Sequence, residues 1–447
     1  MSAAAKRVVV LYLHMAVTSL WMLIPAAQAL GQAPGGGPLG EQIDRLAAQV
    51  EGQVIAWRRD IHEHPELSNR EVRTAGVVAD HLSKLGLDVR TEVAHTGVVG
   101  VLRGGKPGPV VALRADMDAL PVTEAVDLPF ASKVRTLYNG EEVGVMHACG
   151  HDVHTAVLMG VAQVLAQLRE QLPGTVKFIF QPAEEGAPKG EQGGAELMIR
   201  EGALENPRPA AIFGLHVSPK YRVGTLACRS GPIMASSDSL RLVVQGRQTH
   251  GAQPWTGVDP IVVASQIVLG LQTIVSRQSD LTEGPAVITI GSIHGGVRSN
   301  IIPEQVEMLG TVRTFVPEMR KDIHERIRQT ATMIAQGAGA RAEVTIDSGD
   351  PVTFNDPALT ARMVPTLETV AGKAGMVTSP LVTGAEDFSY YQQQIPGMYF
   401  FLGVTSLASD PNQAAMCHSP RFCADESAIT LGVRSLARLA VAYMERQ

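Results

Sequence analysis

The chain has 447 residues, which is long for one compact domain, so we expect two domains. Hydrophobic residues make up 45% and charged residues 18% of it, as in globular proteins with a sizeable core. The formal net charge of -6 argues against nucleic acid as a partner, because neutralising phosphates needs a basic surface.

Residues 1–29 predict an export signal. A basic pair precedes an apolar run over 8–24, and a small-residue cleavage site follows at 27–29. An uncleaved membrane anchor is less favoured, because polar residues interrupt the short run. We therefore expect a periplasmic or secreted protein without a stable membrane anchor, and no later segment that could span a bilayer. In such an oxidising compartment Cys417 and Cys423 are a disulfide candidate.

After a Gly- and Pro-rich tether at 30–41, the chain alternates between helical and strand patterns. The patterns predict helices at 42–57, 71–85 and 154–168, and buried strands at 110–113, 176–180 and 211–215. Alternation of this kind is typical of an α/β fold with a mostly parallel sheet.

The pattern changes after residue 233. The expected elements are a strand at 239–244, a helix at 261–274, strands at 286–293 and 306–312, a helix at 317–334 and a strand at 342–346. This βαββαβ order predicts a small ferredoxin-like α+β domain with two helices on one face of an antiparallel sheet. The alternation of helices and buried strands returns after residue 351. We therefore predict a lid domain at 234–347, inserted between catalytic parts at 42–233 and 348–447.

Residues 146–154, Met-His-Ala-Cys-Gly-His-Asp-Val-His, combine thiol and imidazole groups at a turn that enters a helix. Cys149 and His151 stand two residues apart and can therefore face one metal ion. The alternative is a buried structural cysteine beside histidines that are satisfied by hydrogen bonds.

Two adjacent carboxylates, Glu184 and Glu185, follow the strand expected at 176–180. Bringing two carboxylates together costs free energy unless something cationic balances them. One of them can ligate a metal while the other acts as a general base toward water. A solvated acidic loop is the alternative.

Three further polar residues stand at the ends of elements, where parallel sheets carry their sites. His216 and Asp118 each follow a predicted strand, and His418 lies in the sequence Cys-His-Ser-Pro. Taken alone, a histidine is more often an ordinary hydrogen-bonded residue than a ligand, and such an aspartate often caps a turn.

Together these residues resemble the aminoacylase/carboxypeptidase family of co-catalytic metallopeptidases. More narrowly, they are similar to its branch of hippurate hydrolases, bacterial N-acyl-L-amino acid amidohydrolases and plant auxin-conjugate hydrolases. The resemblance runs from Trp57 to Arg438. It rests on six motifs in family order: RADMDALP, MHACGHDVH, FQPAEEG, GLHV, GTVRTF and GAEDFSYY.

The resemblance implies a pair of divalent metal ions, with zinc as the first expectation and manganese, cobalt or nickel as alternatives. Glu184 matches the general base of the family, and Asp118 matches a carboxylate that orients a ligating imidazole. The positions that match metal ligands are Cys149, His151, Glu185, His216 and His418.

The predicted lid carries further matches. His250 resembles a histidine that reaches the active site of the partner subunit and steadies the oxyanion, which implies a homodimer through the lid. Asn300 and Arg313 match residues that hold the carboxylate of the substrate. Two positions depart from the family pattern: residues 248–249 are Gln-Thr instead of Gly-Gly, and Trp255 replaces a histidine, which could favour bulky aromatic substrates.

The sequence therefore predicts metal-dependent hydrolysis of the amide bond of N-acyl amino acids or similar small conjugates. A dipeptidase or carboxypeptidase with the same chemistry is an alternative. A catalytically inactive periplasmic binding protein is another, although Glu184 argues against it, because a pure metal binder has no use for a base beside its ligands. The full ligand set also argues against a structural or cell-wall protein.

Overall fold

The computed structural model describes residues 38–446, so the predicted export signal and most of the predicted tether lie outside the described residues. Helix α1 (Pro38–Glu63) begins inside the predicted tether and extends six residues beyond the predicted helix end at 57. Its apolar stripe, which includes Ile43, Val50 and Val54, is buried. The helix packs against α3 (His151–Gln167) and α9 (Ile429–Glu445), and this tertiary packing stabilises it.

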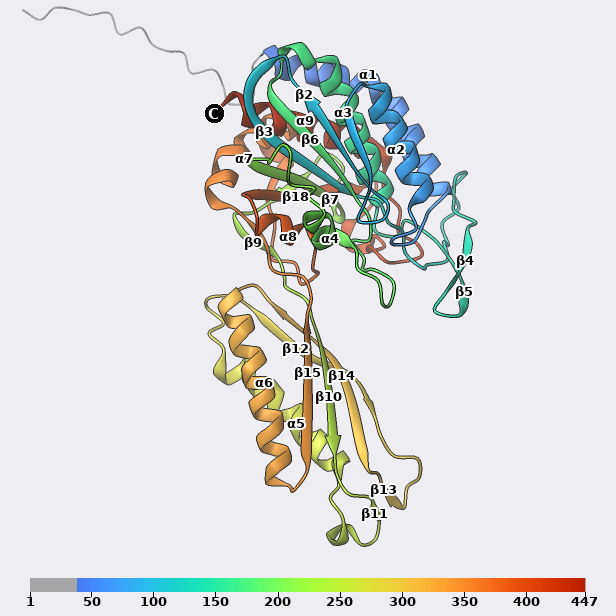
Figure 1. Ribbon diagram of the computed structural model, residues 1–447, viewed down its shortest axis with the longest axis vertical. Helices are drawn as coiled ribbons and strands as arrows, with labels where there is room; N and C mark the ends of the chain where they lie inside the picture. Colours follow the sequence, from blue (N-terminus) through green and yellow to red (C-terminus); the bar gives the residue numbers. More distant parts are fainter. Residues whose placement is uncertain (1–37, 447) are drawn as a thin grey trace, which may run out of the picture. The chain divides into compact units, whose positions relative to one another are not determined.

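Within the described residues, eight strands form the larger sheet (Figure 1). In spatial order they are β1 (Asp88–Val93), β2 (Gly97–Arg103), β6 (Pro173–Gln181), β3 (Lys106–Asp116), β7 (Ala211–Arg222), β18 (Gly397–Thr405), β8 (Leu226–Cys228) and β17 (Met376–Thr378). The central strands β6, β3, β7 and β18 run parallel. Strands β1 and β2 pair antiparallel at one edge, and β8 joins β18 antiparallel. The predicted α/β fold is confirmed, with antiparallel pairs in addition.

Helices cover both faces of this sheet. One face shares a hydrophobic core with α1, α3, α9, α2 (Val72–Lys84) and α7 (Pro357–Ala371). The other face packs against α4 (Gly194–Arg200) and α8 (Phe388–Gln392). Neighbouring residues of β6 divide between the two cores, Phe180 facing the first and Ile179 the second. Strands buried on both faces appear in a sequence as continuous apolar runs, which is why β3, β6 and β7 could be predicted.

Residues 238–348, here called the inserted unit, form a second sheet with a core of its own. Its strands are β12 (Ala286–His294), β14 (Gln305–Thr314), β10 (Asp238–Gln245) and β15 (Arg341–Ser348), all antiparallel, and α5 (Pro260–Thr273) and α6 (Pro317–Gly337) pack on them (Figure 1). The predicted βαββαβ order is confirmed, whereas the domain boundaries and the role as a lid stay predictions.

The chain leaves for the inserted unit and returns from it at one place. The backbone N–H of Ser237 donates to the carbonyl of Asp350 at 3.0 Å, and that of Gly349 donates to the carbonyl of Ser237 at 2.9 Å. Beside this crossing, β9 (Gly231–Met234) pairs with β16 (Thr353–Asn355). The inserted unit is therefore connected through two hydrogen-bonded segments.

Helix α5 continues into a π-helical turn, and residues 260–278 are long and apolar enough to cross a membrane by length and composition. The expectation that no segment after the signal meets this criterion was wrong. Val263, Ile267 and Leu271 of α5 are buried in the core of the inserted unit, and this packing accounts for part of the apolar composition.

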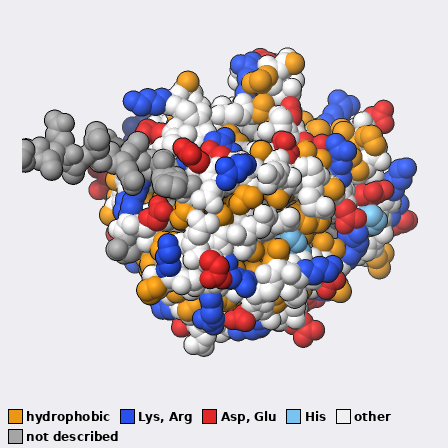
Figure 2. Space-filling view, turned by 90° about the horizontal axis from the view of Figure 1, so that it is seen from above, with side chains coloured by type: hydrophobic (Ala, Val, Ile, Leu, Met, Phe, Trp, Pro, Cys, Tyr) orange, Lys and Arg blue, Asp and Glu red, His pale blue; other side chains and the backbone are white. Residues whose placement is uncertain are grey.

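Acidic and basic side chains are interspersed on the face that Figure 2 shows, with hydrophobic groups between them. Such mixing is typical of a protein surface that carries a modest net charge.

Candidate active site

The predicted site residues come together because they follow or lie on neighbouring strands of the larger sheet. Strand β3 lies between β6 and β7. Asp118 follows β3, Glu184 and Glu185 follow β6, and His216 lies on β7. The carboxyl ends of parallel strands meet at one edge of a sheet, so these side chains converge there. Strand β7 runs on to residue 222, so His216 lies inside the strand rather than after it.

Unusual backbone conformations carry several of these residues. Gly150, at the start of α3, has a φ of 88°, and a Cβ there would lie 2.3 Å from Cγ2 of Val217, so this turn requires glycine. Ala183 and His418 adopt left-handed conformations with φ values of 54° and 69° although neither is glycine. Strain of this kind is typical of functional sites, where the surrounding structure maintains it.

Cys149, His151 and His216 form a first group, in which the potential ligand atoms lie within 4.8 Å of one another. Sγ of Cys149 lies 3.4 Å from Nε2 of His216. Nδ1 of His216 donates to the carbonyl of Val217 at 2.6 Å, which leaves Nε2 with a free lone pair. Nδ1 of His151 likewise donates to the carbonyl of Asp118 at 2.8 Å. Both histidines are therefore oriented by the nitrogen that faces away from the thiol.

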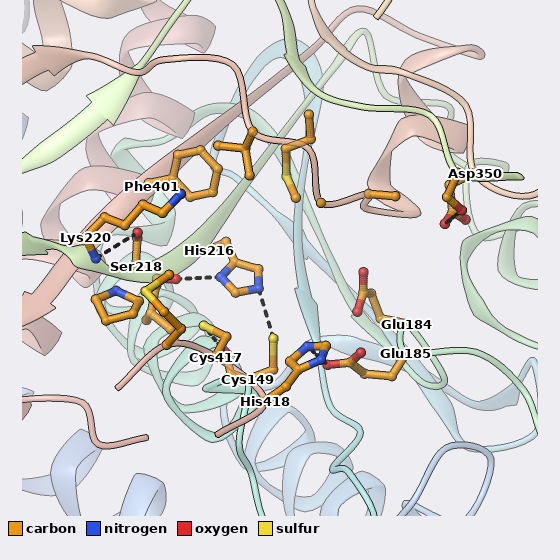
Figure 3. A pocket seen from close by; sticks show the side chains of 18 of the residues that line it. Cys149, Glu184, Glu185, His216, Ser218, Lys220, Asp350, Phe401, Cys417 and His418 are labelled. Atoms are coloured by element: carbon orange, nitrogen blue, oxygen red, sulfur yellow. Dashed lines mark hydrogen bonds and ion pairs between the residues drawn. The ribbon is translucent and has the colours of Figure 1, made fainter. Parts of the chain in front are cut away.

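Cys149 also belongs to a second group, with Glu185 and His418. Nε2 of His418 lies 3.1 Å from Oε1 of Glu185 (Figure 3). A third group joins His151 with Glu184 and Glu185. Cys149, His151 and Glu185 thus each take part in two of these three groups.

The arrangement fits a divalent metal ion by its own chemistry. Nε2 of His151 is buried and has no hydrogen-bond partner among the described residues, although buried imidazole nitrogens ordinarily have one. Thiolate, imidazole and carboxylate together suit zinc and related ions. Burial raises the pKa of Glu184 well above its ordinary value, and the nearby carboxylates of Glu386 and Glu185 raise it further. A bound cation would balance this concentration of negative charge.

Asp118 connects the candidate base with a candidate ligand. Its carboxylate accepts the backbone N–H groups of Glu184 at 3.1 Å and Glu185 at 3.0 Å. Its Oδ1 also lies 3.2 Å from Nδ1 of His151. Burial would raise the pKa of Asp118, but the hydrogen bond and the charge of His151, with hydrogen bonds from Ser68 and Glu185, together outweigh burial, so the pKa lies below its ordinary value. An orienting role needs contacts of this kind, and the role itself stays a prediction.

His154 belongs to the same nine-residue motif, but both of its ring nitrogens already have hydrogen-bond partners. Nδ1 donates to Asp116 at 2.6 Å, and Nε2 accepts the backbone N–H of Val217 at 2.8 Å. His154 therefore supports the site and is not free to bind a metal ion.

A cavity of about 500 Å³ opens onto the site (Figure 3). Glu184 lines it together with four of the five predicted ligands, Cys149, Glu185, His216 and His418. Arg313 and Asp350 bring one positive and one negative side chain to the same cavity. Its apolar side chains include Met234, Val382, Phe401 and Met416.

His250 and Asn300 are not among the described residues that line this cavity. Both are exposed and lie where β11 (Thr249–His250) pairs with β13 (Ile301–Ile302). Trp255 is 77% exposed and does not line the cavity either. One chain therefore brings Arg313 to the site, but not Asn300, His250 or Trp255, and the roles of these three stay predictions.

A buried network that was not predicted from the sequence lies beside Glu184. The guanidinium of Arg114 lies 3.0 Å from Glu386 and 2.8 Å from Asp387. The hydroxyl of Tyr399 donates to Glu386 at 2.6 Å. Glu386 and Asp387 belong to the GAEDFSYY motif, which was the available signal, although no role was assigned to them.

All four cysteines lie within the described residues and are free, so the candidate pair Cys417 and Cys423 is not joined by a disulfide. Cys417 lines the cavity with Cys149, whereas Cys423 lines a different surface pocket. The backbone turns between the two residues, with the N–H of Phe422 donating to the carbonyl of Ser419 at 3.0 Å. This turn separates the two thiols.

Comparisons with known proteins agree with this geometry. The sequence model of peptidase family M20/M25/M40 matches residues 112–442. Thermostable carboxypeptidase 2 of Saccharolobus solfataricus is 41% identical over 91% of this chain and 100% of its own length. N-acetylcysteine deacetylase of Bacillus subtilis is 40% identical over 88% of this chain and 97% of its own. The solved structure of a dinuclear metal binding peptidase from Bacillus subtilis superposes with a TM-score of 0.74 at 38% identity, covering 89% and 99% of the two chains.

Proposed function

This chain belongs to peptidase family M20/M25/M40, and on that premise we propose that it hydrolyses the amide bond of N-acyl amino acids or related conjugates with bound divalent metal. One observation carries the proposal: Glu184 lies among overlapping groups of metal-binding side chains and lines the same cavity as they do. Metal binding alone needs no additional carboxylate, whereas hydrolysis needs a base beside the metal.

Two divalent ions would occupy the site, with zinc favoured over manganese, cobalt and nickel. The overlap of the groups at Cys149 and the dinuclear relative from Bacillus subtilis support a pair. When bound, such ions supply positive charge that acidifies water and polarises the carbonyl of the substrate. The residues that would hold them are Cys149, His151, Glu185, His216 and His418.

Glu184 would take a proton from water and pass it to the nitrogen of the leaving amine. Its pKa is raised by burial and by neighbouring carboxylates, and positive charge close by favours its ionised form, so base and metal are expected to act together. Asp118 holds the backbone N–H of Glu184 and thereby fixes the turn that carries the base.

Arg313 would select the amino-acid half of the substrate. It lines the cavity, and a guanidinium group binds a free carboxylate through paired hydrogen bonds. The apolar side chains of Phe401, Met416, Met234 and Val382 would contact the acyl group or the amino-acid side chain.

A dipeptidase or carboxypeptidase is the second candidate, and Asp350 is the observation in its favour. This carboxyl group lines the cavity, where it could pair with the α-ammonium group of an unacylated dipeptide. The carboxypeptidase of Saccharolobus solfataricus, at 41% identity, supports the same possibility.

We further propose that the protein is exported and acts as a homodimer through the inserted unit. The predicted signal at residues 1–29 supports export. Helix α5 exposes Ile261, Val262 and Leu269, and a second copy of the chain would cover such an apolar surface. His250 could then reach the cavity of the partner.

Hydrolysis of a small substrate panel tests the proposed function. The purified mature chain would be offered N-acetyl-, N-benzoyl- and aromatic N-acyl amino acids and unmodified dipeptides, with and without chelator. We expect release of the free amino acid that stops on chelation and returns with added metal. Faster turnover of the dipeptides would favour the second candidate. No turnover of any substrate by the metal-loaded protein would support the inactive binding protein instead.

A further inference from the structure

Two thiols lie side by side in the cavity because the backbone joins the segments that carry them. The N–H of His418 donates to the carbonyl of Ala148 at 2.8 Å. Cys149 follows Ala148 and Cys417 precedes His418, so this bond places the two cysteines side by side (Figure 3). Sγ of Cys417 lies 4.0 Å from the carbonyl oxygen of Cys149.

We propose that Cys149 and Cys417 form a reversible disulfide that removes Cys149 from the metal centre. Both thiols line the cavity and both are free, so a small oxidant that enters the cavity meets a reduced pair. A disulfide needs a sulfur–sulfur distance of about 2.05 Å, and the backbone hydrogen bond between His418 and Ala148 holds the two cysteines on adjacent segments. The proposal rests on the proposed function in one respect, that Cys149 is a metal ligand.

The other two cysteines have different surroundings. Cys228 is 4% exposed, and its thiol contacts the carbonyl of Tyr399 and the side chain of Asn355. Cys423 lines a separate pocket and provides a matched control only six positions from Cys417. The thiol pairing in the cavity is therefore specific to Cys149 and Cys417.

A peroxide is an oxidant that balances this reaction. Sγ of Cys417, the less buried of the pair, attacks one peroxide oxygen; the O–O bond breaks, and a sulfenic acid and water form. Sγ of Cys149 then attacks the sulfenic sulfur, and the S–O bond breaks to give the disulfide and a second water molecule. Two electrons pass from the two sulfurs to the peroxide, and the two thiol protons leave in the water.

Metal binding and disulfide formation exclude each other, because both use Sγ of Cys149. Free metal at about 100 times its dissociation constant leaves about 1% of the sites empty, so we expect oxidation to slow about 100-fold. Bound metal would thus protect the pair, and loss of metal would expose it to oxidation.

Peptide mapping and intact mass test the proposal on the mature chain. After metal removal and treatment with hydrogen peroxide, we expect a mass loss of about 2 Da, from the two thiol hydrogens, and a peptide pair that joins Cys149 to Cys417. Dithiothreitol should reverse both changes, and zinc uptake, measured by elemental analysis, should be lost and regained with them. Cys423→Ser should behave as the wild type, whereas Cys417→Ser should bind zinc and form no cross-link.

A cross-link between Cys417 and Cys423, or irreversible oxidation of both cavity thiols without a cross-link, would overturn the proposal. The wild-type peptide map decides the question even if Cys417→Ser fails to fold. The result is separable from the proposed function, because the map needs no substrate turnover, and the substrate panel is run on reduced, metal-loaded protein.

Discussion

Nδ1 of His151 lies 2.8 Å from the backbone oxygen of Asp118 and 3.2 Å from one oxygen of its carboxylate. Both oxygens are acceptors, so Nδ1 carries the proton and the lone pair of Nε2 is free for a metal ion. Asp118 is 1% exposed, so it holds the ring from inside the protein. The orientation of this imidazole is therefore fixed before any metal binds.

Replacing this carboxylate should weaken metal binding. We expect Asp118→Ala to reduce zinc affinity about 10- to 100-fold, because the His151 ring and the turn at Glu184 both lose a partner. Competition with a chromophoric chelator measures the affinity. Asp127→Asn, on the exposed surface, is the matched control and should bind zinc as the wild type does. Unchanged affinity in Asp118→Ala would contradict the orienting role.

Glu184→Gln should separate binding from turnover. The amide keeps the shape of the side chain but cannot accept the proton of water, so we expect kcat to fall by about 10²- to 10⁴-fold. Zinc content, measured on the same sample by elemental analysis, should stay near that of the wild type. Glu191→Gln, in the loop that follows, is the control and should keep full activity. Equal turnover of both variants would assign the base elsewhere.

The sequence predicted elements best where one local pattern decides them. Helix α6 was expected at 317–334 and runs over Pro317–Gly337, and β12 was expected at 286–293 and runs over Ala286–His294. Strands β1 and β2 were not predicted. Strand β2 pairs with β6, which is distant in the chain, whereas β1 pairs with β2, its neighbour in the sequence. The periodicity of apolar residues predicts a helix or a strand, but it does not predict which strands pair with each other.

The same limit applies to the site. The ligand set followed from motifs that are each local in sequence. The contact between Arg114 and Asp387, by contrast, joins residues 273 positions apart, and the pairing of Cys149 with Cys417 joins residues 268 apart. Cys423 was instead the candidate partner of Cys417, because the two cysteines are close in the sequence. Such contacts become visible only once the sheet order is known.

Arg313 should control recognition of the carboxylate. We expect Arg313→Ala to lower kcat/KM for N-acyl amino acids about 10- to 100-fold, since a hydrogen bond to a charged group contributes about 1.5–3 kcal/mol. Steady-state kinetics with each N-acyl amino acid and its carboxamide measures this, and the carboxamide should be affected far less. Arg241→Ala, which removes an arginine paired with Glu307 in the inserted unit, is the control. An equal loss with both substrates would argue against carboxylate binding.

The stability of the protein should depend on pH through His62. Burial would lower its pKa, but Asp152 and Glu124 outweigh burial and raise it to about 9. The charged ring is therefore favoured in the folded state, and its contribution is complete below the ordinary value of about 6.5 and lost as the pH rises through about 9. The raised pKa of His62 differs from its ordinary value by about 2.5, so the charged ring contributes at most about 3 kcal/mol to the free energy of unfolding.

Denaturant unfolding of the metal-free protein between pH 6 and about 9.5 checks this linkage. The difference in unfolding free energy between the wild type and His62→Gln should be largest near pH 6 and should shrink as the pH rises. His294 is an exposed histidine of the inserted unit, and His294→Gln should have the same unfolding free energy as the wild type at every pH. A difference for His62→Gln that does not change with pH would mean that its ring is not charged in the folded protein.

His250 offers a test of whether the active site is shared between two chains. Its imidazole does not line the cavity of its own chain, and in the proposed dimer it serves the partner. We expect His250→Ala and Glu184→Gln each to be nearly inactive alone. After the two variants are unfolded and refolded together, half of the dimers should be mixed, and one of the two sites in each mixed dimer should hold both residues intact. The mixture should then recover about a quarter of the wild-type activity.

The alternative gives the opposite result. If His250 acted within its own chain, no site in the mixture would contain both Glu184 and His250, and activity would stay at the level of the single variants. Full activity of His250→Ala alone would instead remove this residue from the reaction. Sedimentation of each variant and of the mixture shows whether dimers form, so absence of recovery is interpreted only when mixed dimers are present. Recovered activity would then connect the exposed position of His250 with catalysis in the neighbouring subunit.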